Sequence, residues 1–395
     1  MSNDEEDIQM LRSEKRILTT HAGSLSRPAQ LIGAYEKRST GQVFDDCLAS
    51  SVAAVIREQR EANIDIVNDG EFGKPSAAVD YAAWASYIFD RISGFTLEKG
   101  VTGVGPHSSK DRADFREFYE SGAIPGGGGG VARSYSLVCT GPIEYTGHAL
   151  IERDIENFRA GLEGSGASEA FMSAVSPATV TIRKNHYYRS DAQYSAAVAR
   201  ALNAEYRAIA DAGFVLQIDD PCIVDLYDWW FSLNRTWEDY RAWAAFQVEI
   251  LNEALTGIPE DRVRYHFCWG SWHGPHSTDV ELKNVVDLLL RIKAQAYSVE
   301  AGNVRHAHEW KVWRDISVPE GKIVIPGVVS HATNVLEHPE LVADRLVQYA
   351  EAVGRENVIA GTDCGLGGRV HPQLAWAKLR ALAEGAELAT GHLWR

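Results

Sequence analysis

Eight short apolar runs alternate with amphipathic stretches along this 395-residue chain, and this alternation constrains the fold more than any other feature. Short runs rich in Val and Ile predict strands, and helical patterns between most of them predict parallel strands joined by helical crossovers. Eight such units fit an α/β fold of the (β/α)8 TIM barrel type better than an open doubly wound sheet. The absence of a G-x-G-x-x-G or Walker loop weakens the open-sheet alternative without removing it.

The pattern predicts strands over residues 16–24, 64–71, 170–177, 214–221, 263–269, 294–302, 322–330 and 357–365. It predicts helices over residues 43–62, 191–212, 236–256, 279–293, 338–353 and 371–387.

A single catalytic barrel over residues 1–395 accounts for the length, since barrels run from roughly 200 to more than 400 residues. Residues 1–14 are expected to form a disordered or loosely attached N-terminus. The interval 90–165, between the second and third strands, is predicted to hold an inserted hairpin or subdomain. No Lys-Ser/Thr or helix start follows its glycine run, 126–130, so this run is not a phosphate cradle. We interpret it as a flexible loop, with a mobile lid as the alternative.

Composition excludes several classes of partner and compartment. The formal net charge of −15 disfavours nucleic acid and anionic membranes, which require clustered Lys and Arg. The acidic N-terminus lacks the features of a signal peptide, and no apolar run reaches the roughly 20 residues of a membrane span. Five widely spaced cysteines argue against a disulfide framework. We therefore expect a cytoplasmic protein, and a homo-oligomer is compatible with this composition.

Polar residues gather where the predicted strands end, which is where TIM barrels carry their chemistry. His21, Gly23 and Ser24 end the first strand, Asp69 to Glu71 the second, and Ser176 the third. Later strands end in Asp219 and Asp220, His266 and Cys268, Glu300, Ser330 and His331, and Asp363 and Cys364. Barrel strands are otherwise apolar, so this concentration predicts an enzyme.

Four of these strand-end residues form a candidate metal site. His266 and Cys268 lie two positions apart on an extended segment, so both side chains point the same way. Glu300 ends the next strand and Cys364 ends the last. One imidazole, two thiolates and one carboxylate suit tetrahedral Zn²⁺. His266 and Cys268 alone are a weak signal, since a buried structural cysteine is the commoner outcome, and the combination with Glu300 and Cys364 favours the metal.

The blocks "LQIDDP", "HFC", "SVE", "PGVVSH" and "GTDCGL" resemble the catalytic half of cobalamin-independent methionine synthase and its stand-alone relatives. Those relatives include the zinc-dependent epoxyalkane:coenzyme M transferases. The resemblance covers most of the chain and implies the zinc ligands His266, Cys268, Glu300 and Cys364. The loops "GSWHGPHSTD" and "NVRHAHEW" depart from the synthase pattern.

The resemblance also implies roles for residues around the metal. It implies a carboxylate at Asp219 that orients the substrate, beside Asp220 where the family usually has Glu. Gly23 and Ser24 would hold the carboxylate of a thiol substrate, and His331 would donate a proton to the leaving group. Glu71 matches an acidic position of the family, and Asp80 matches a further one ambiguously. His21 and Ser176 are expected to line the same pocket.

These residues favour a zinc-dependent transferase that activates a small thiol as a zinc thiolate for attack on a methyl or other alkyl carbon. The donor can be a folate. An epoxide:thiol transferase of the coenzyme M type is the first alternative, and a zinc lyase or hydrolase that activates water is the second. A third hypothesis, a structural zinc in a non-catalytic protein, leaves Ser24, Glu71, Asp219 and His331 without a purpose.

Overall fold

The computed structural model describes residues 10–37, 39–74, 86–99, 109–121, 135–233, 235–270 and 273–395. The expected loose N-terminus lies largely outside these ranges. The glycine run 126–130 and Asp80 also lie outside the described residues. Among the helices that are described, none is both long enough and apolar enough to span a membrane.

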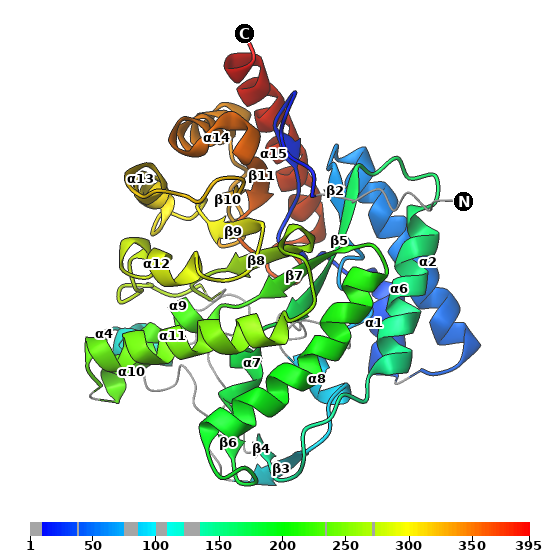
Figure 1. Cartoon of the computed structure of the whole chain (residues 1–395). Coiled ribbons are helices and arrows are strands. Elements are labelled where there is room, and N and C mark those ends of the chain that lie inside the picture. The colour runs from blue at the N-terminus through cyan, green and yellow to red at the C-terminus, as the bar shows by residue number, and fades with distance from the viewer. Residues whose placement is uncertain are drawn as a thin grey trace, which may run out of the picture.

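Eight parallel strands form the centre of the molecule, in the order β1-β11-β10-β9-β8-β7-β5-β2. The backbone N–H of Asp65 donates to the carbonyl of Thr19 at 3.1 Å, which joins the two ends of this sheet. The strands therefore form a (β/α)8 barrel, as predicted (Figure 1). The strands are β1 (Leu18–Thr19), β2 (Ile66–Val67), β5 (Glu169–Val175), β7 (Val215–Asp219), β8 (Val263–Phe267), β9 (Ala296–Glu300), β10 (Ile323–Val329) and β11 (Ile359–Thr362).

Each predicted strand overlaps one of these observed strands, seven contain it completely, and β5 begins one residue before its prediction; each observed strand is shorter than its prediction. A buried apolar cluster fills the barrel interior near the amino ends of the strands. Seven of the eight strands and Met10 contribute its residues. These members are Met10, Leu18, Ile66, Phe171, Val215, Ala296, Ile323, Ile325 and Ile359. The polar strand ends are left at the opposite, carboxyl face.

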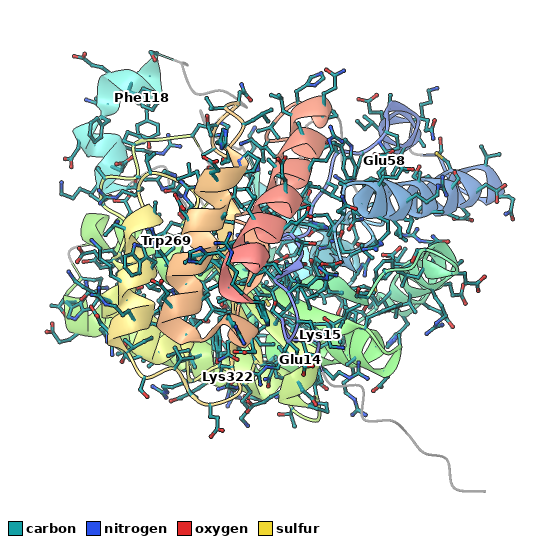
Figure 2. All side chains as sticks on the ribbon, turned by 90° about the horizontal axis from the view of Figure 1, so that it is seen from above. Glu14, Lys15, Glu58, Phe118, Trp269 and Lys322 are labelled. Carbon is teal, nitrogen blue, oxygen red and sulfur yellow. The ribbon has the colours of Figure 1, made fainter. Side chains whose placement is uncertain are left out.

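Amphipathic helices surround the sheet. In α2 (Gln42–Glu61) the buried residues Phe44, Leu48, Val52 and Val55 recur every three or four positions, which gives one apolar face. Thr236 and Asp239 form a capping box that starts α11 (Trp237–Ala254). The remaining outer helices are α1 (Ala29–Glu36), α6 (His148–Leu162), α8 (Asp191–Asp211), α13 (Trp310–Asp315), α14 (Pro339–Val353) and α15 (Pro372–Leu393). Figure 2 shows α14 and α15 side by side.

The predicted helix 279–293 is wrong over most of its length. Only α12 (Val286–Leu289) is α-helical, after a single 3₁₀ turn over Leu282–Asn284. The backbone N–H of Leu282 donates to Glu309 Oε1 at 2.7 Å, so a tertiary contact replaces regular helix at this point. The apolar spacing of Ile151, Ile155 and Phe158 identifies α6, which the sequence interpretation did not include.

The interval 90–165 contains an antiparallel pair, β3 (Phe95–Lys99) with β4 (Tyr135–Cys139), extended by β6 (Lys184–Asn185). It also contains the short helices α4 (Lys110–Asp114) and α5 (Arg116–Glu120). Figure 1 shows α4 beside α10 (Tyr227–Ser232). Along the chain, β7 is followed by α9 (Cys222–Asp225) and then by α10. The α6 helix at the end of this interval packs against α2 and α8.

Candidate metal centre and active site

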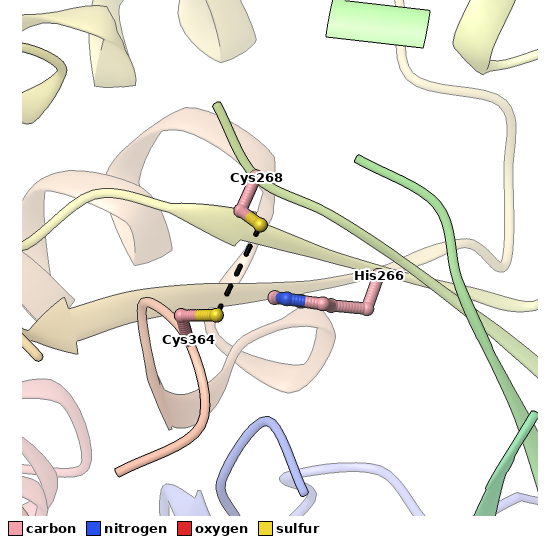
Figure 3. A group of neighbouring side chains, drawn as sticks. All are labelled: His266, Cys268 and Cys364. Carbon is pink, nitrogen blue, oxygen red and sulfur yellow. Dashed lines mark hydrogen bonds between the residues drawn. The ribbon is translucent and has the colours of Figure 1, made fainter. Parts of the chain in front are cut away.

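His266, Cys268 and Cys364 converge at the carboxyl face of the barrel (Figure 3). One ligand atom from each lies within 4.8 Å of the others, and the two sulfurs are 3.9 Å apart. His266 lies in β8, and Cys268 comes directly after the last residue of that strand. The two residues are two positions apart on extended backbone, so both side chains face the same side. Cys364 comes two residues after β11 and brings the second sulfur from 96 residues away.

The imidazole of His266 is oriented for a ligand. Its Nδ1 lies 3.0 Å from Ser298 Oγ, while its buried Nε2 has no hydrogen-bond partner among the residues that the structure describes. A buried nitrogen without a partner costs roughly 1–3 kcal/mol, so such an atom in a native structure calls for an explanation. Metal-bound histidines characteristically use one nitrogen for an outer contact and the other for the metal. The three side chains thus fit a thiophilic divalent cation such as Zn²⁺.

The pKa values of the Cys268 and Cys364 thiols shift in opposite directions. The interaction with Cys268 lowers the pKa of the Cys364 thiol well below its usual range, against the effect of burial. The interaction with Cys364, burial and the charge of Glu300 raise the pKa of Cys268 well above its usual range. Within the described residues, neither cysteine forms a disulfide. A bound cation would favour both sulfurs as thiolates.

Glu300 ends β9 in a second group, with His331 and Asp363, whose ligand atoms also lie within 4.8 Å of one another. Its Oε2 accepts a hydrogen bond from the backbone N–H of Trp269 at 2.8 Å. Its Oε1 accepts one from Asn303 Nδ2 at 2.6 Å. The structure thus brings three of the four predicted metal ligands together and places Glu300 next to them, in the neighbouring group.

His331 is buried against Asp363. Its Nδ1 and its backbone N–H both lie 2.8 Å from Asp363 Oδ1. Burial alone would lower the pKa of His331, but the charge of Asp363 raises it to about 9. In the described part of the chain, Asp363 Oδ2 is buried without a hydrogen-bond partner, so this carboxylate offers an acceptor inside the site. The pair can hold a proton and deliver it to a neighbouring group.

A second set of polar residues lies on the strand and loop next to His266. Asp219 pairs with His266 in the register of β7 and β8, and its Oδ1 accepts a hydrogen bond from Gln217 Nε2 at 2.6 Å. Burial and the charge of Glu71 raise the pKa of Asp219 to about 7. Glu71 Oε2 lies 3.5 Å from the ammonium of Lys74, which is itself buried. Asp219, Glu71 and Lys74 thus form one charged group beside His266.

Gly23 and Ser24 lie between these two polar groups. Gly23 has a φ of +126°, and a Cβ there would lie 2.5 Å from Glu71 Oε1, so only glycine allows this approach. The carbonyl of Ser24 accepts hydrogen bonds from the backbone N–H groups of Leu366 and Gly367 at 2.9 and 3.0 Å. The loop after β1 is therefore tied directly to the loop that carries Cys364.

Three other predicted pocket residues have structural partners. His21 Nε2 lies 2.8 Å from Gln59 Oε1, and its Nδ1 accepts a hydrogen bond from the N–H of Gly23 at 3.2 Å. Ser176 caps α7 (Pro177–Thr181), since its Oγ accepts from the N–H of Thr179. Asp220 Oδ1 accepts from the N–H of Cys222 at 3.1 Å, which starts α9. Asp80 lies outside the described residues.

Several site residues were missed by the sequence interpretation. Ser298 and Gln217 each lie two positions before a predicted site residue on the same strand, so strand parity could have identified them. Arg264, two positions before His266, donates to the carbonyl of His21 at 2.7 Å from inside the barrel. Nothing in the local sequence marks Lys74, because its meeting with Glu71 depends on the left-handed conformation of Glu71, with φ of +62°.

The fold and the site define the chain as a parallel α/β barrel whose thiol and imidazole side chains meet at the carboxyl face. Residues 139–388 match the family model described as cobalamin-independent synthase, catalytic domain. The chain belongs to this family, whose members include transferases and methyltransferases.

The curated relatives are remote in sequence but similar in length. A 2-hydroxypropyl-CoM lyase of Xanthobacter autotrophicus is 24% identical, with 95% of this chain and 96% of that protein covered. A methionine synthase of Sulfolobus acidocaldarius is 25% identical, with 88% and 85% covered. The solved structure of a B12-independent methionine synthase from Shewanella, in complex with selenomethionine, matches with a TM-score of 0.68 and 20% identity. That match covers 96% of this chain and 99% of the other, and it confirms the barrel.

Proposed function

We propose that this protein is a zinc-dependent transferase that alkylates a small thiol. The observation that supports this most directly is the buried, partnerless Nε2 of His266 beside the sulfurs of Cys268 and Cys364. These three residues would hold the metal, with Glu300 as the proposed fourth ligand. A bound zinc supplies the positive charge that makes a substrate thiol acidic near neutral pH.

The chain's own residues orient the substrate and move the proton. Asp219 and Glu71, with Ser24, would hold the polar end of the thiol substrate. The substrate thiol would release its proton to water, its sulfur would attack an alkyl carbon, and the bond from that carbon to its leaving nitrogen or oxygen would break, with the electron pair staying on the leaving atom. His331, buried on Asp363, would give a proton to the departing nitrogen or oxygen. The proton given to that atom would be restored to His331 from water. Holding both reactants can lower the barrier by roughly 7–11 kcal/mol.

The electrophile is either a methyl donor, such as a folate, or an epoxide. The names of the relatives suggest both, since one is a methionine synthase and another a 2-hydroxypropyl-CoM lyase. The same residues serve either reaction, because each needs an activated thiol and a proton for the leaving atom. We further propose a cytoplasmic location, where the free cysteines would stay reduced.

Metal analysis of purified protein tests the site. We expect about one zinc per chain, as in a single His/Cys site, and Cys364→Ser should lose most of it. Cys47→Ser is the matched control, since Cys47 is a free cysteine on α2 and outside the cluster. Full zinc retention in Cys364→Ser would show that this cysteine is not a ligand.

Product analysis tests the reaction. The protein is incubated with a panel of thiols together with methyl donors or epoxides, and thioethers are sought by mass spectrometry. Thioether from the wild type and not from Cys364→Ser supports thiol alkylation. Products formed only with water would favour the lyase or hydrolase alternative.

A further inference from the structure

The loops that follow β8 and β9 meet in a buried cluster of charged residues. Asp279 Oδ2 lies 2.9 Å from both His276 Nδ1 and His306 Nε2, and Glu309 Oε2 lies 2.9 Å from His306 Nδ1. His306, Asp279 and Glu309 are each almost fully buried. These are the two loops whose sequences depart from the synthase pattern.

The ring of His306 is fixed on three sides. Each ring nitrogen faces a carboxylate oxygen, and the ring stacks on the indole of Trp269 with centroids 3.8 Å apart and planes 15° apart. Burial lowers the pKa of His306, but the hydrogen bonds to Asp279 and Glu309, with the charge of Glu300, raise it to about 9. Both nitrogens are therefore donors, and the imidazolium cannot turn without losing an ion pair.

Trp269 connects this ring to the candidate metal centre. It follows Cys268 directly, it is fully buried, and its backbone N–H donates to Glu300 Oε2 at 2.8 Å. Its indole Nε1–H donates to the carbonyl of Val280 at 2.7 Å, which fixes the other end of the residue. Figure 2 places Trp269 within the body of the molecule. A shift of the indole would therefore move a donor to Glu300 and the residue next to Cys268.

The second donor to Glu300 also depends on His306. Asn303 Nδ2 donates to Glu300 Oε1 at 2.6 Å. Asn303 Oδ1 in turn accepts hydrogen bonds from the backbone N–H groups of Arg305 and His306, at 2.8 and 3.1 Å. Both oxygens of Glu300 are thus held by groups in contact with His306, one through its ring and the other through its backbone.

Backbone strain marks the same cluster. His276 has a φ of +53°, in the left-handed region that non-glycine residues rarely adopt. Such a conformation costs roughly 1–3 kcal/mol and persists where surrounding contacts hold it. Its contact with Asp279 supplies one such interaction, at 2.9 Å. This strain indicates that the cluster fixes the loop in one arrangement.

We propose that His306 is a positioning residue that sets the orientation of the Glu300 carboxylate through Trp269 and Asn303. It acts through Trp269, the residue that follows Cys268, and through Asn303. The inference rests on the proposed function, since it assigns His306 to the metal centre of that reaction. Residues that orient metal ligands from outside typically change metal affinity 10- to 100-fold when removed.

The test compares His306→Gln with His308→Gln. His308 lies on the 3₁₀ turn (Ala307–Glu309) that directly follows His306 and is exposed, so it is a matched control. Cobalt(II) replaces zinc in each variant, because its visible absorption bands report the ligand set and geometry. We expect His306→Gln to bind the metal about 10- to 100-fold more weakly, with shifted cobalt bands, and His308→Gln to match the wild type.

Unchanged affinity and cobalt bands in His306→Gln would overturn the inference while leaving the proposed function intact. A wild-type protein that takes up neither zinc nor cobalt would overturn both. Thermal unfolding checks that each variant is folded. If His306→Gln does not fold, Asp279→Asn decides by the same two measurements, since it keeps the size of the side chain and removes one ion-pair partner of the ring.

Discussion

Gly327 is the position where a single methyl group should do most damage to the site. It lies on β10 between Glu300 of β9 and the end of β11. A Cβ at this residue would lie 2.2 Å from Asp363 Cα and 2.4 Å from Asp363 N. Carbon atoms in contact are normally about 3.5–4.0 Å apart, so Gly327→Ala requires a displacement of at least about 1.3 Å. Backbone atoms are involved, and no side-chain rotation can relieve the overlap.

The displacement should weaken the pairing of β10 with β11 and move Asp363 from His331. Overpacking in a core costs typically 1–3 kcal/mol, and backbone overlap places this case at about 3 kcal/mol or more. Chemical denaturation followed by circular dichroism measures the free energy of unfolding. Gly391→Ala is the control: it lies in α15, no heavy atom lies within 4 Å of the place its methyl group would take, and it should gain roughly 0.5–1 kcal/mol. A Gly327→Ala protein as stable as the wild type would refute the reasoning.

Three further outcomes follow from buried polar contacts. Gln59→Leu should lower the free energy of unfolding by roughly 3 kcal/mol, since it removes the partner of His21 Nε2 and leaves buried polar groups unpaired. The carboxylates around His306 raise its pKa from 6.5 to about 9 against the effect of burial. The charged His306 should therefore contribute on the order of 3 kcal/mol to the free energy of unfolding, and this contribution should be complete below pH 6.5. It should be lost as the pH rises through 9. Asp111→Ala should increase hydrogen exchange at the N–H of Ser277, which donates to Asp111 Oδ1 at 2.9 Å.

Each of these outcomes has a contrary result. Wild-type stability in Gln59→Leu would mean that His21 needs no fixed partner. A difference in stability between wild type and His306→Gln that does not shrink from pH 6.5 to pH 9 would contradict the charged state of His306. Unchanged exchange at Ser277 in Asp111→Ala would show that α4 does not hold the loop after β8.

The candidate site illustrates how far strand periodicity extends. His266 and Cys268 share a face because side chains alternate along any strand, and no tertiary information is needed for that conclusion. Cys364 joins them because parallel strands in a barrel end at one face. Glu300 was expected in the same set for the same reason, but its carboxylate lies with His331 and Asp363, where Trp269 and Asn303 donate to it. Strand periodicity determines that a side chain lies at the carboxyl face, and the hydrogen bonds it accepts determine which side chains it lies next to.

The sequence alone determined the barrel and the chemical kinds of side chain at its carboxyl face, because both follow from local alternation and from the order of the strands. Only the tertiary structure decided which of those side chains meet. The cluster around His306 joins two loops, and the Lys74–Glu71 pair closes one turn; both depend on left-handed backbone conformations, at His276 and Glu71. The loop sequences do not encode such conformations by any period. They persist because contacts made elsewhere in the fold hold them.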